Sequence, residues 1–304
     1  MSVAITGLSG LLGRYLVQTD RAHRTIIGVS RAAQPEVSAG VEGWVTTDLA
    51  EAGAGRAALA DIRPDAVIHA AGEGRVDIVE GHMDQFRGLN VDAAGEIAGY
   101  CAEQSIPLVF LSSNAVFGGR QEAPYTDDSP LDPVNDYGRL KAESESAVLT
   151  ADPAALVLRP LLMYGVPFPT GRSNPALHWV RELAAGREVR VVDDVRTQPL
   201  WAADCAEAIW RCIDLGLTGT LNISGGVSLT LFEFAQLTAE VFGYDVNLVV
   251  PIASSSLTAL APRPATTAFD LRRLHDDLGF TPMPPRQGLQ ALRHELIEHG
   301  LLSG

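Results

Sequence analysis

Cysteine is scarce in this sequence, and its distribution excludes one class of fold. Only Cys101, Cys205 and Cys212 occur among 304 residues, and no two of them form a C-x-x-C pair. An odd count without such a pair argues against a disulfide framework and indicates small buried side chains in a reducing compartment. A chain of this length buries enough apolar surface to fold without cross-links or a structural metal.

Positive charge and long apolar runs are also lacking. The 23 Lys and Arg residues are outnumbered by 37 Asp and Glu residues, which gives a formal net charge of −14. Such a chain has no basic surface for nucleic acid and is repelled by anionic membranes. No run approaches the roughly 18 apolar residues of a membrane span, and the apolar N-terminus lacks the basic segment of a signal peptide. We therefore expect a cytoplasmic protein that binds neither nucleic acid nor membrane.

Short β-branched runs alternate with helical patterns in the first half of the chain. The expected strands are 3–6, 25–30, 44–47, 66–70, 108–113 and 155–160. Helical spacing of apolar residues covers 10–20, 85–104 and 134–150. Strands that are apolar on both faces and separated by helices predict a parallel sheet covered on both sides. Right-handed crossovers then give an α/β, Rossmann-type doubly wound fold.

The pattern changes after about Arg159, where prolines become frequent. The stretches 251–264 and 281–285 are rich in Pro, Ser and Ala. Further helices are expected at 173–185, 202–215, 230–243 and 286–299, with short strands at 189–192 and 220–223. We predict a dinucleotide-binding domain over 1–160 and a smaller, interleaved α+β substrate domain over 161–304, with segments that return to the first domain.

Three glycines, each separated from the next by two residues, directly follow the first expected strand. Glycine allows a sharp turn and brings backbone N–H groups against a pyrophosphate at the positive end of a helix. The G-x-x-G-x-x-G spacing is a modified form of the general dinucleotide fingerprint. The predicted contacts here are Gly7, Ser9, Gly10, Leu11, Leu12 and Gly13.

The second expected strand ends with Arg31 and has no acidic residue at its end. In dinucleotide folds an acid here holds the ribose 2′-OH of NAD, whereas an arginine accommodates the 2′-phosphate of NADP. Arg31 therefore favours NADP(H) over NAD(H), with a solvated surface arginine as the alternative. Asp48, after the third strand, is placed either to accept a hydrogen bond from adenine or to cap a helix.

Tyr137 and Lys141 are four residues apart in an expected helix, so their side chains lie on one face. A nearby ammonium favours the phenolate form of a tyrosine and brings it into the working range of a general acid or base. A Ser-rich strand end precedes this pair, and the Ser113 hydroxyl there can polarise a substrate carbonyl. We predict that Ser113, Tyr137 and Lys141 are catalytic, with an exposed helix pair as the alternative.

Taken together, these residues resemble an extended short-chain dehydrogenase/reductase over essentially the whole chain. The residues that carry the resemblance are the glycine turn, His69-Ala70-Ala71-Gly72, Asn90, Ser113 and Tyr137-x-x-x-Lys141. The resemblance implies a nicotinamide cofactor with contacts beyond the glycine turn. These are Arg31, Asp48, Leu49, Ala70, Ala71, Gly72, Asn90, Tyr137, Lys141 and Arg159. His69 is more simply a structural histidine than an acid or base.

Three segments resemble the dTDP-4-dehydrorhamnose reductase type within the epimerase/dehydratase group. They are A-x-x-x-x-V-D-x-x-E at 71–80, Ser112 to Gly118, and Arg263 to Asp270. The resemblance implies reduction of a 4-keto nucleotide sugar, with Tyr137 as proton donor and Lys141 on the ribose hydroxyls. It also implies substrate contacts from Ser113, Asn114, Arg196 and Arg263, the two arginines holding a diphosphate.

One departure from the family patterns restricts the reaction. Asn114-Ala115 stands where 4,6-dehydratases carry an Asp-Glu pair, so elimination of water lacks its acid and base. An NAD-dependent nucleotide-sugar 4-epimerase remains an alternative, and so does a non-catalytic NADP-binding regulatory subunit.

No metal site is expected, because His294 and His299 are five residues apart and do not share a helix face. The family resemblance also suggests a homodimer.

Overall fold

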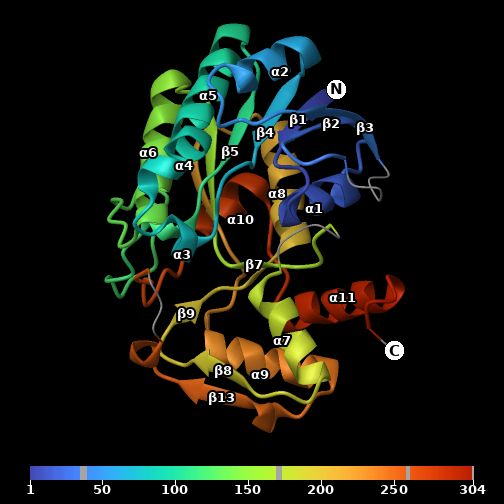
Figure 1. Ribbon diagram of the computed structural model, residues 1–304, viewed down its shortest axis with the longest axis vertical. Helices are drawn as coiled ribbons and strands as arrows, with labels where there is room; N and C mark the ends of the chain where they lie inside the picture. Colours follow the sequence, from blue (N-terminus) through green and yellow to red (C-terminus); the bar gives the residue numbers. More distant parts are fainter. Residues whose placement is uncertain (35–39, 169–172, 258–260, 303–304) are drawn as a thin grey trace.

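A parallel sheet of seven strands forms the centre of the larger lobe (Figure 1). The computed structural model describes residues 1–34, 40–168, 173–257 and 261–302. The strands are Ser2–Thr6 (β1), Thr25–Ser30 (β2), Val41–Thr46 (β3), Ala66–His69 (β4), Leu108–Leu111 (β5), Leu156–Pro160 (β6) and Gly219–Ile223 (β11). Their spatial order is β11-β6-β5-β4-β1-β2-β3. This order confirms the predicted Rossmann-type doubly wound sheet, because the chain starts near the centre and winds outward in both directions.

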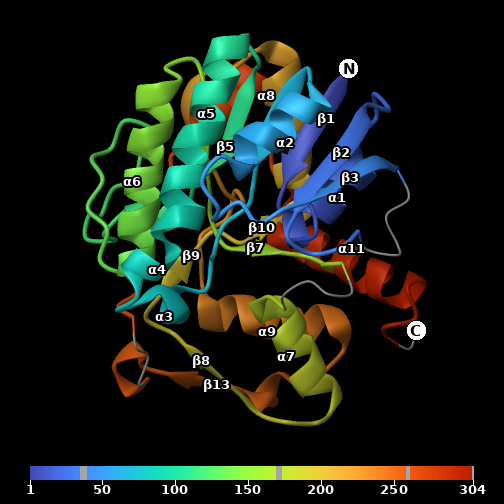
Figure 2. The same cartoon turned by 45° about the horizontal axis from the view of Figure 1, so that its top comes forward.

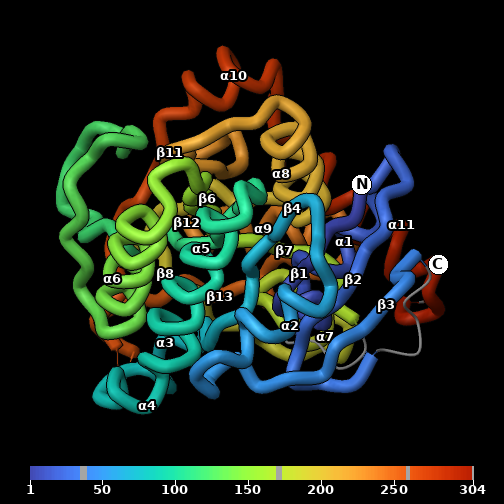
Figure 3. Tube along the Cα trace, turned by 90° about the horizontal axis from the view of Figure 1, so that it is seen from above, coloured from blue at the N-terminus to red at the C-terminus, as the bar shows by residue number. Residues whose placement is uncertain are grey.

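Helices cover both faces of the sheet. They are Leu11–Thr19 (α1), Ala54–Ile62 (α2), Ala93–Gln104 (α5), Asp136–Ala151 (α6) and Ala202–Leu215 (α8). Successive side chains of a strand point to opposite faces. In β1, Val3 and Ile5 join the apolar cluster that contains α1 and α8, whereas Ala4 joins the cluster with α5. Figure 3 shows α8 and α5 on opposite sides of the strands.

The helix expected over 85–104 is divided in the structure. Met83–Arg87 (α4) leads into one π-helical turn, Gly88–Asp92, and then into α5. The π turn contains Asn90, which is 1% exposed. Such turns frequently mark functional positions in helices. Two other short elements border the same region, namely the α-helical turn Val76–Val79 (α3) and the 3₁₀ turn Asn114–Val116.

The smaller lobe lies beyond the carboxyl ends of the strands (Figures 1 and 2). Its elements are Pro175–Ala184 (α7), Val189–Val192 (β8), Leu231–Phe242 (α9), the 3₁₀ turn Val246–Leu248, Val249–Ile252 (β13) and the 3₁₀ turn Ser254–Ser256. Pairs of two-residue strands connect the lobes, Met163–Tyr164 (β7) with Leu200–Trp201 (β10), and Arg196–Thr197 (β9) with Leu229–Thr230 (β12). Pro285–Glu298 (α11) packs on α9. Residues 258–260 of the predicted Pro-rich stretch 251–264 lie outside the described residues.

The chain returns to the larger lobe after entering the smaller one. Strand β11 pairs in parallel with β6, from Gly219 opposite Leu156 to Ile223 opposite Pro160. Arg272–Leu278 (α10) then packs against α8 and β11. Segments beyond residue 160 therefore complete the main sheet, and the division of the chain at that residue stays a prediction.

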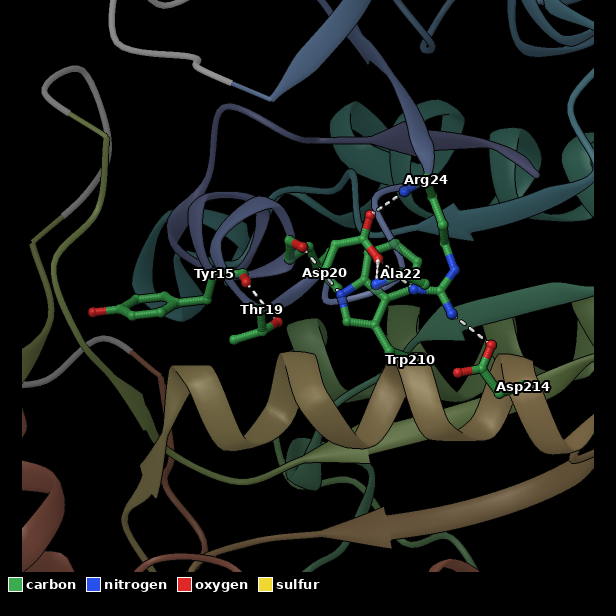
Figure 4. A network of polar contacts seen from close by, with 8 residues as sticks. Tyr15, Thr19, Asp20, Ala22, Arg24, Trp210 and Asp214 are labelled. Atoms are coloured by element: carbon green, nitrogen blue, oxygen red, sulfur yellow. Dashed lines mark hydrogen bonds and ion pairs between the residues drawn. The ribbon is translucent and has the colours of Figure 1, made fainter.

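A buried arginine attaches the returning helix α8 to the first βα unit (Figure 4). Arg24 is 8% exposed and forms ion pairs with Asp20 at the end of α1 and with Asp214 of α8. Its guanidinium lies 4.6 Å from the centre of the Trp210 ring, and the Trp210 indole donates to the Leu16 carbonyl at 3.0 Å. The cation–π contact and the ion pairs act together here, and they fix the position of α8 relative to α1.

Candidate active site

The glycine turn after β1 has the shape of an anion cradle. Gly7 has φ of +69°, and a Cβ there would lie 2.8 Å from the Ala70 carbonyl oxygen and the Ala71 nitrogen. Gly10 is the N-cap of α1 and offers no side chain to the first-turn N–H groups. Those groups, together with the positive helix end, fit a pyrophosphate. The backbone of Leu11 and Leu12 belongs to this turn.

The side chains around the cradle have mainly structural contacts. The Ser9 hydroxyl lies 3.1 Å from the Ser30 hydroxyl at the end of β2. Leu12 is 6% exposed and packs in the main apolar cluster, with Leu11 partly buried beside it. Gly13 faces Leu8 so closely that a Cβ would lie 2.0 Å from the Leu8 oxygen. Close packing of α1 on β1 therefore requires glycine at this position.

Arg31 and Asp48 follow two neighbouring strands, β2 and β3, and meet at the sheet edge. The Arg31 side chain is 79% exposed, and its guanidinium lies 3.6 Å from a carboxylate oxygen of Asp48. Asp48 also accepts a hydrogen bond from the Ala50 N–H at 3.0 Å. Leu49 is buried in an apolar cluster with Val29, so only its backbone can face a ligand. The exposed Arg31 is available to an anionic group at this edge.

Asn90 holds the loop that follows β4. Its side-chain oxygen accepts from the Glu73 N–H at 2.8 Å, and its amide donates to the Glu73 carbonyl at 3.0 Å. A Cβ on Gly72 would lie 3.3 Å from Asn90 Oδ1 and 3.8 Å from Lys141 Nζ. The structure thus brings the predicted cofactor loop 70–72 and Asn90 next to the predicted catalytic lysine.

Helix α6 presents Tyr137 in its first turn and Lys141 one turn later. Asn135 caps the helix by accepting from the Gly138 N–H at 2.8 Å. The Lys141 ammonium donates to the Leu111 carbonyl at 2.8 Å and lies 5.0 Å from the Phe110 ring centre. Burial lowers the pKa of Lys141 to about 8, although the neighbouring carboxylate on the next turn opposes the shift. The lysine is therefore a buried cation that begins to lose its proton near neutral pH.

His69 lies beside this lysine at the end of β4. Its Nδ1 is 2.6 Å from the Thr6 hydroxyl, and its ring stacks on Phe110 with centres 5.7 Å apart. Burial, together with the Lys141 charge, lowers the pKa of His69 to about 3. A histidine that stays neutral under all working conditions fits the structural interpretation.

A cavity of about 960 Å³ lies between the two lobes and is lined by five of the predicted residues. Ser113, Asn114 and Tyr137 line it from the larger lobe, and Arg196 and Arg263 line it from the segments that reach the smaller lobe. Clefts at the carboxyl ends of parallel strands are the usual ligand sites of such folds. Two of the three predicted catalytic residues, Ser113 and Tyr137, therefore share one cavity with the predicted substrate residues.

The polar residues of this cavity are held in place by neighbours. The Ser113 hydroxyl accepts from the Ala115 N–H at 3.2 Å, and the Asn114 amide donates to the Thr267 hydroxyl at 2.9 Å. The Arg196 guanidinium donates to the Ser228 carbonyl at 3.1 Å. The Arg263 guanidinium forms an ion pair with Asp77, an acid from another element.

Arg159 is buried in an ion pair. Its side chain, which the sequence resemblance placed at the cofactor, is 5% exposed and forms two hydrogen bonds to the Glu145 carboxylate, at 2.9 and 2.6 Å. It also donates to the Asp127 carbonyl at 2.9 Å. Ser112 adds a further hydrogen bond to Glu145. The Arg159 side chain therefore joins β6 to α6, and its contact with a dinucleotide stays a prediction.

Some cavity residues were not predicted from the sequence. Trp179 of α7, Arg190 of β8 and Asp77 of α3 also line the cavity. No local motif marks Trp179 or Arg190, and their place in the cavity results from the docking of the smaller lobe. Asp77 belongs to the A-x-x-x-x-V-D-x-x-E segment, but that resemblance did not indicate a place in the cavity.

A model of the RmlD substrate-binding domain family matches residues 1–297. The chain belongs to this family. It is accordingly an oxidoreductase chain of the extended short-chain dehydrogenase/reductase type, as the resemblance predicted. Within the described residues we find no cluster of three His, Cys, Asp or Glu side chains that could hold a metal ion. No described helix is long and apolar enough to cross a membrane.

Relatives of the chain share its full length. It is 35% identical over 95% of its length, and 92% of the relative, to a probable dTDP-4,6-dihydroxy-2-methyloxan-3-one 4-ketoreductase of Streptomyces antibioticus. It is 30% identical over 93% of its length, and 84% of the relative, to methionine adenosyltransferase 2 subunit beta of Bos taurus. A solved dTDP-4-dehydrorhamnose reductase of Bacillus anthracis, in complex with NADP, superposes with a TM-score of 0.86 at 26% identity, covering 97% and 99% of the two chains.

Proposed function

We propose that this chain is an NADPH-dependent reductase of a keto group on a dTDP-activated sugar. The observation that carries the proposal is the meeting of Ser113 and Tyr137 on one cavity, with Lys141 buried on the same helix beside Gly72. The family members named as dTDP-sugar ketoreductases support the substrate class. The cradle at Gly7 and Gly10 fits the pyrophosphate of a nicotinamide dinucleotide.

The side chains have complementary tasks in such a reduction. When bound, a reduced nicotinamide supplies the hydride that the carbonyl carbon accepts. Ser113 donates a hydrogen bond to the carbonyl oxygen, which stabilises the negative charge that develops there. Tyr137 gives its hydroxyl proton to that oxygen, so the ketone becomes an alcohol, and the tyrosine regains a proton from solvent. The Lys141 ammonium stabilises the tyrosinate and holds ribose hydroxyls of the cofactor.

The reaction is tested by titrating the purified protein with NADPH and NADH and then adding a panel of dTDP-4-keto sugars. We expect NADPH to bind more tightly and to be oxidised by at least one sugar of the panel, read at the reduced-nicotinamide absorbance. Bound NAD at purification, with turnover that consumes no NADPH, would instead identify an epimerase. Tight NADPH binding, a protein partner and no oxidation would identify a regulatory subunit; the Bos taurus relative is itself named as a subunit of methionine adenosyltransferase 2.

Arg31 is the residue proposed to select NADPH. Arg31→Ala should weaken NADPH binding by about 10- to 100-fold, because a charge-assisted hydrogen bond to the 2′-phosphate is lost, while NADH binding changes by less than about threefold. Isothermal titration of both cofactors measures the effect. The exposed Arg21→Ala serves as a control for the loss of one positive charge. Equal weakening of both cofactors by Arg31→Ala would contradict the assignment.

A further inference from the structure

Two acidic residues of one short turn contact different parts of the site, and the proposed reduction gives neither of them a role. Asp77 and Glu80 belong to residues 76–81, which we call the α3 turn. Glu80 is three positions after Asp77, so their side chains lie on the same face of the turn. Val79 between them is fully buried and packs with Val91 and Leu140, and Tyr137 is partly buried against the same cluster. The turn is therefore fixed to the body of the larger lobe.

Glu80 holds the start of α6. Its carboxylate accepts from the N–H of Asp136, the first residue of that helix, at 2.9 Å. In return, the Asp136 carboxylate accepts from the Gly81 N–H at 2.8 Å. First-turn N–H groups have no partner within their own helix, and a carboxylate near them is favourable. The reciprocal contact fixes the residue directly before Tyr137.

Asp77 holds the segment that carries Arg263. Its carboxylate accepts from the Arg263 guanidinium at 2.9 Å and from the Ala261 N–H at 3.3 Å. Asn135, the N-cap of α6, also holds this segment by donating to the Pro262 carbonyl at 2.9 Å. The start of the catalytic helix and the cavity arginine are thus tied to the same short turn.

We propose that Asp77 and Glu80 are positioning residues, Glu80 for the Tyr137 hydroxyl and Asp77 for the Arg263 guanidinium. The inference rests on the proposed reduction of a dTDP-sugar. A long arginine side chain that is 39% exposed loses rotamer freedom when a ligand binds it. The ion pair with Asp77 already restricts the rotamers of the Arg263 side chain before the diphosphate binds. Glu80 acts on the proton-transfer step, since a displacement of about 1 Å at a reacting group can cost about 100-fold in rate.

If Glu80 positions Tyr137, kcat should fall when residue 80 no longer has a side-chain oxygen to accept the hydrogen bond from the Asp136 N–H. Glu80→Ala should lower kcat by about 10- to 100-fold, with the KM for the sugar and the Kd for NADPH within about threefold of wild type. Glu80→Gln keeps an oxygen for the Asp136 N–H and should recover most of that loss. Asp84→Ala removes an exposed acid from the neighbouring helix α4 and serves as the matched control. If Glu80→Ala lowers only the melting temperature and leaves kcat of the folded enzyme unchanged, the positioning role is wrong.

The Asp77 assignment is tested by a double-mutant cycle that needs no turnover. The probe is dTDP, titrated calorimetrically into protein saturated with NADPH. Asp77→Ala and Arg263→Ala should each raise the dTDP Kd by about 10-fold or more, and the double variant should be within about threefold of Arg263→Ala alone. If the fold-changes in the dTDP Kd of the two single variants multiply in the double variant, Asp77 acts independently of Arg263 and the pairing is overturned.

The two experiments separate this inference from the proposed reduction. A wild-type protein that binds dTDP but reduces no panel sugar refutes the reduction, and the cycle still decides whether Asp77 positions Arg263. A protein that turns over but shows independent Asp77 and Arg263 effects refutes the positioning and leaves the reduction standing. Failure of the wild-type protein to bind dTDP would overturn both.

Discussion

Tyr137→Phe is expected to lower kcat by about 100- to 10,000-fold while NADPH binding stays within about threefold of wild type. The phenol is the proposed source of the proton for the carbonyl oxygen, and loss of a positioned acid typically costs this much. The ring itself still packs beside Val79 and Leu140, so the first turn of α6 should keep its place. Single-turnover oxidation of NADPH with the sugar substrate measures the chemical step directly.

The matched control is Tyr100→Phe. Tyr100 is 7% exposed in α5, and its hydroxyl donates to the Leu59 carbonyl at 3.3 Å, away from the cavity. This variant also loses a phenolic hydroxyl, but one that does not line the cavity, so the enzyme should reduce the sugar at the wild-type rate. Retention of the wild-type rate by Tyr137→Phe would refute the proposed proton donor.

Arg159→Met is expected to lower the free energy of unfolding by about 3–5 kcal/mol, because it leaves the Glu145 carboxylate buried without its partner. Urea unfolding of the variant and of the wild-type protein at the same pH measures this difference.

A double variant separates the ion pair from its individual charges. Arg159→Met with Glu145→Gln removes both charges and keeps an acceptor for the Ser112 hydroxyl, so most of the stability should return. At low temperature the folded single variant should bind NADPH nearly as tightly as wild type. A large loss of NADPH affinity together with normal stability would support the predicted contact of Arg159 with the cofactor.

The strands of the main sheet were predictable because their residues are apolar on both faces. β4, β5 and β6 are fully buried along their lengths, which is the property that the runs at 66–70, 108–113 and 155–160 encode. The helix α2 was not predicted, because Gly53 at its N-cap and Gly55 in its first turn are typical of a loop. The division of 85–104 by a π turn has no signal in residue spacing.

The candidate site was predictable where its residues are close in sequence. Gly7 and Gly10 share one turn, and Tyr137 and Lys141 share one helix, so spacing alone places the two glycines in one backbone turn and the Tyr137 and Lys141 side chains on one helix face. Contacts between distant segments carry no such signal. Asp77 and Arg263 are separated by 186 positions. The ion pair of Arg159 with Glu145 was not predicted for the same reason, since a strand sequence does not show that a helix carboxylate lies above it.

The pairing of β11 with β6 also has a consequence during synthesis on the ribosome. β6 ends at Pro160, but its outer neighbour is complete only at Ile223. With roughly 60 residues still to be made at about 5–20 residues per second, one side of β6 waits several seconds for its partner. Throughout that interval the nascent chain exposes an open strand edge, to which other chains can add.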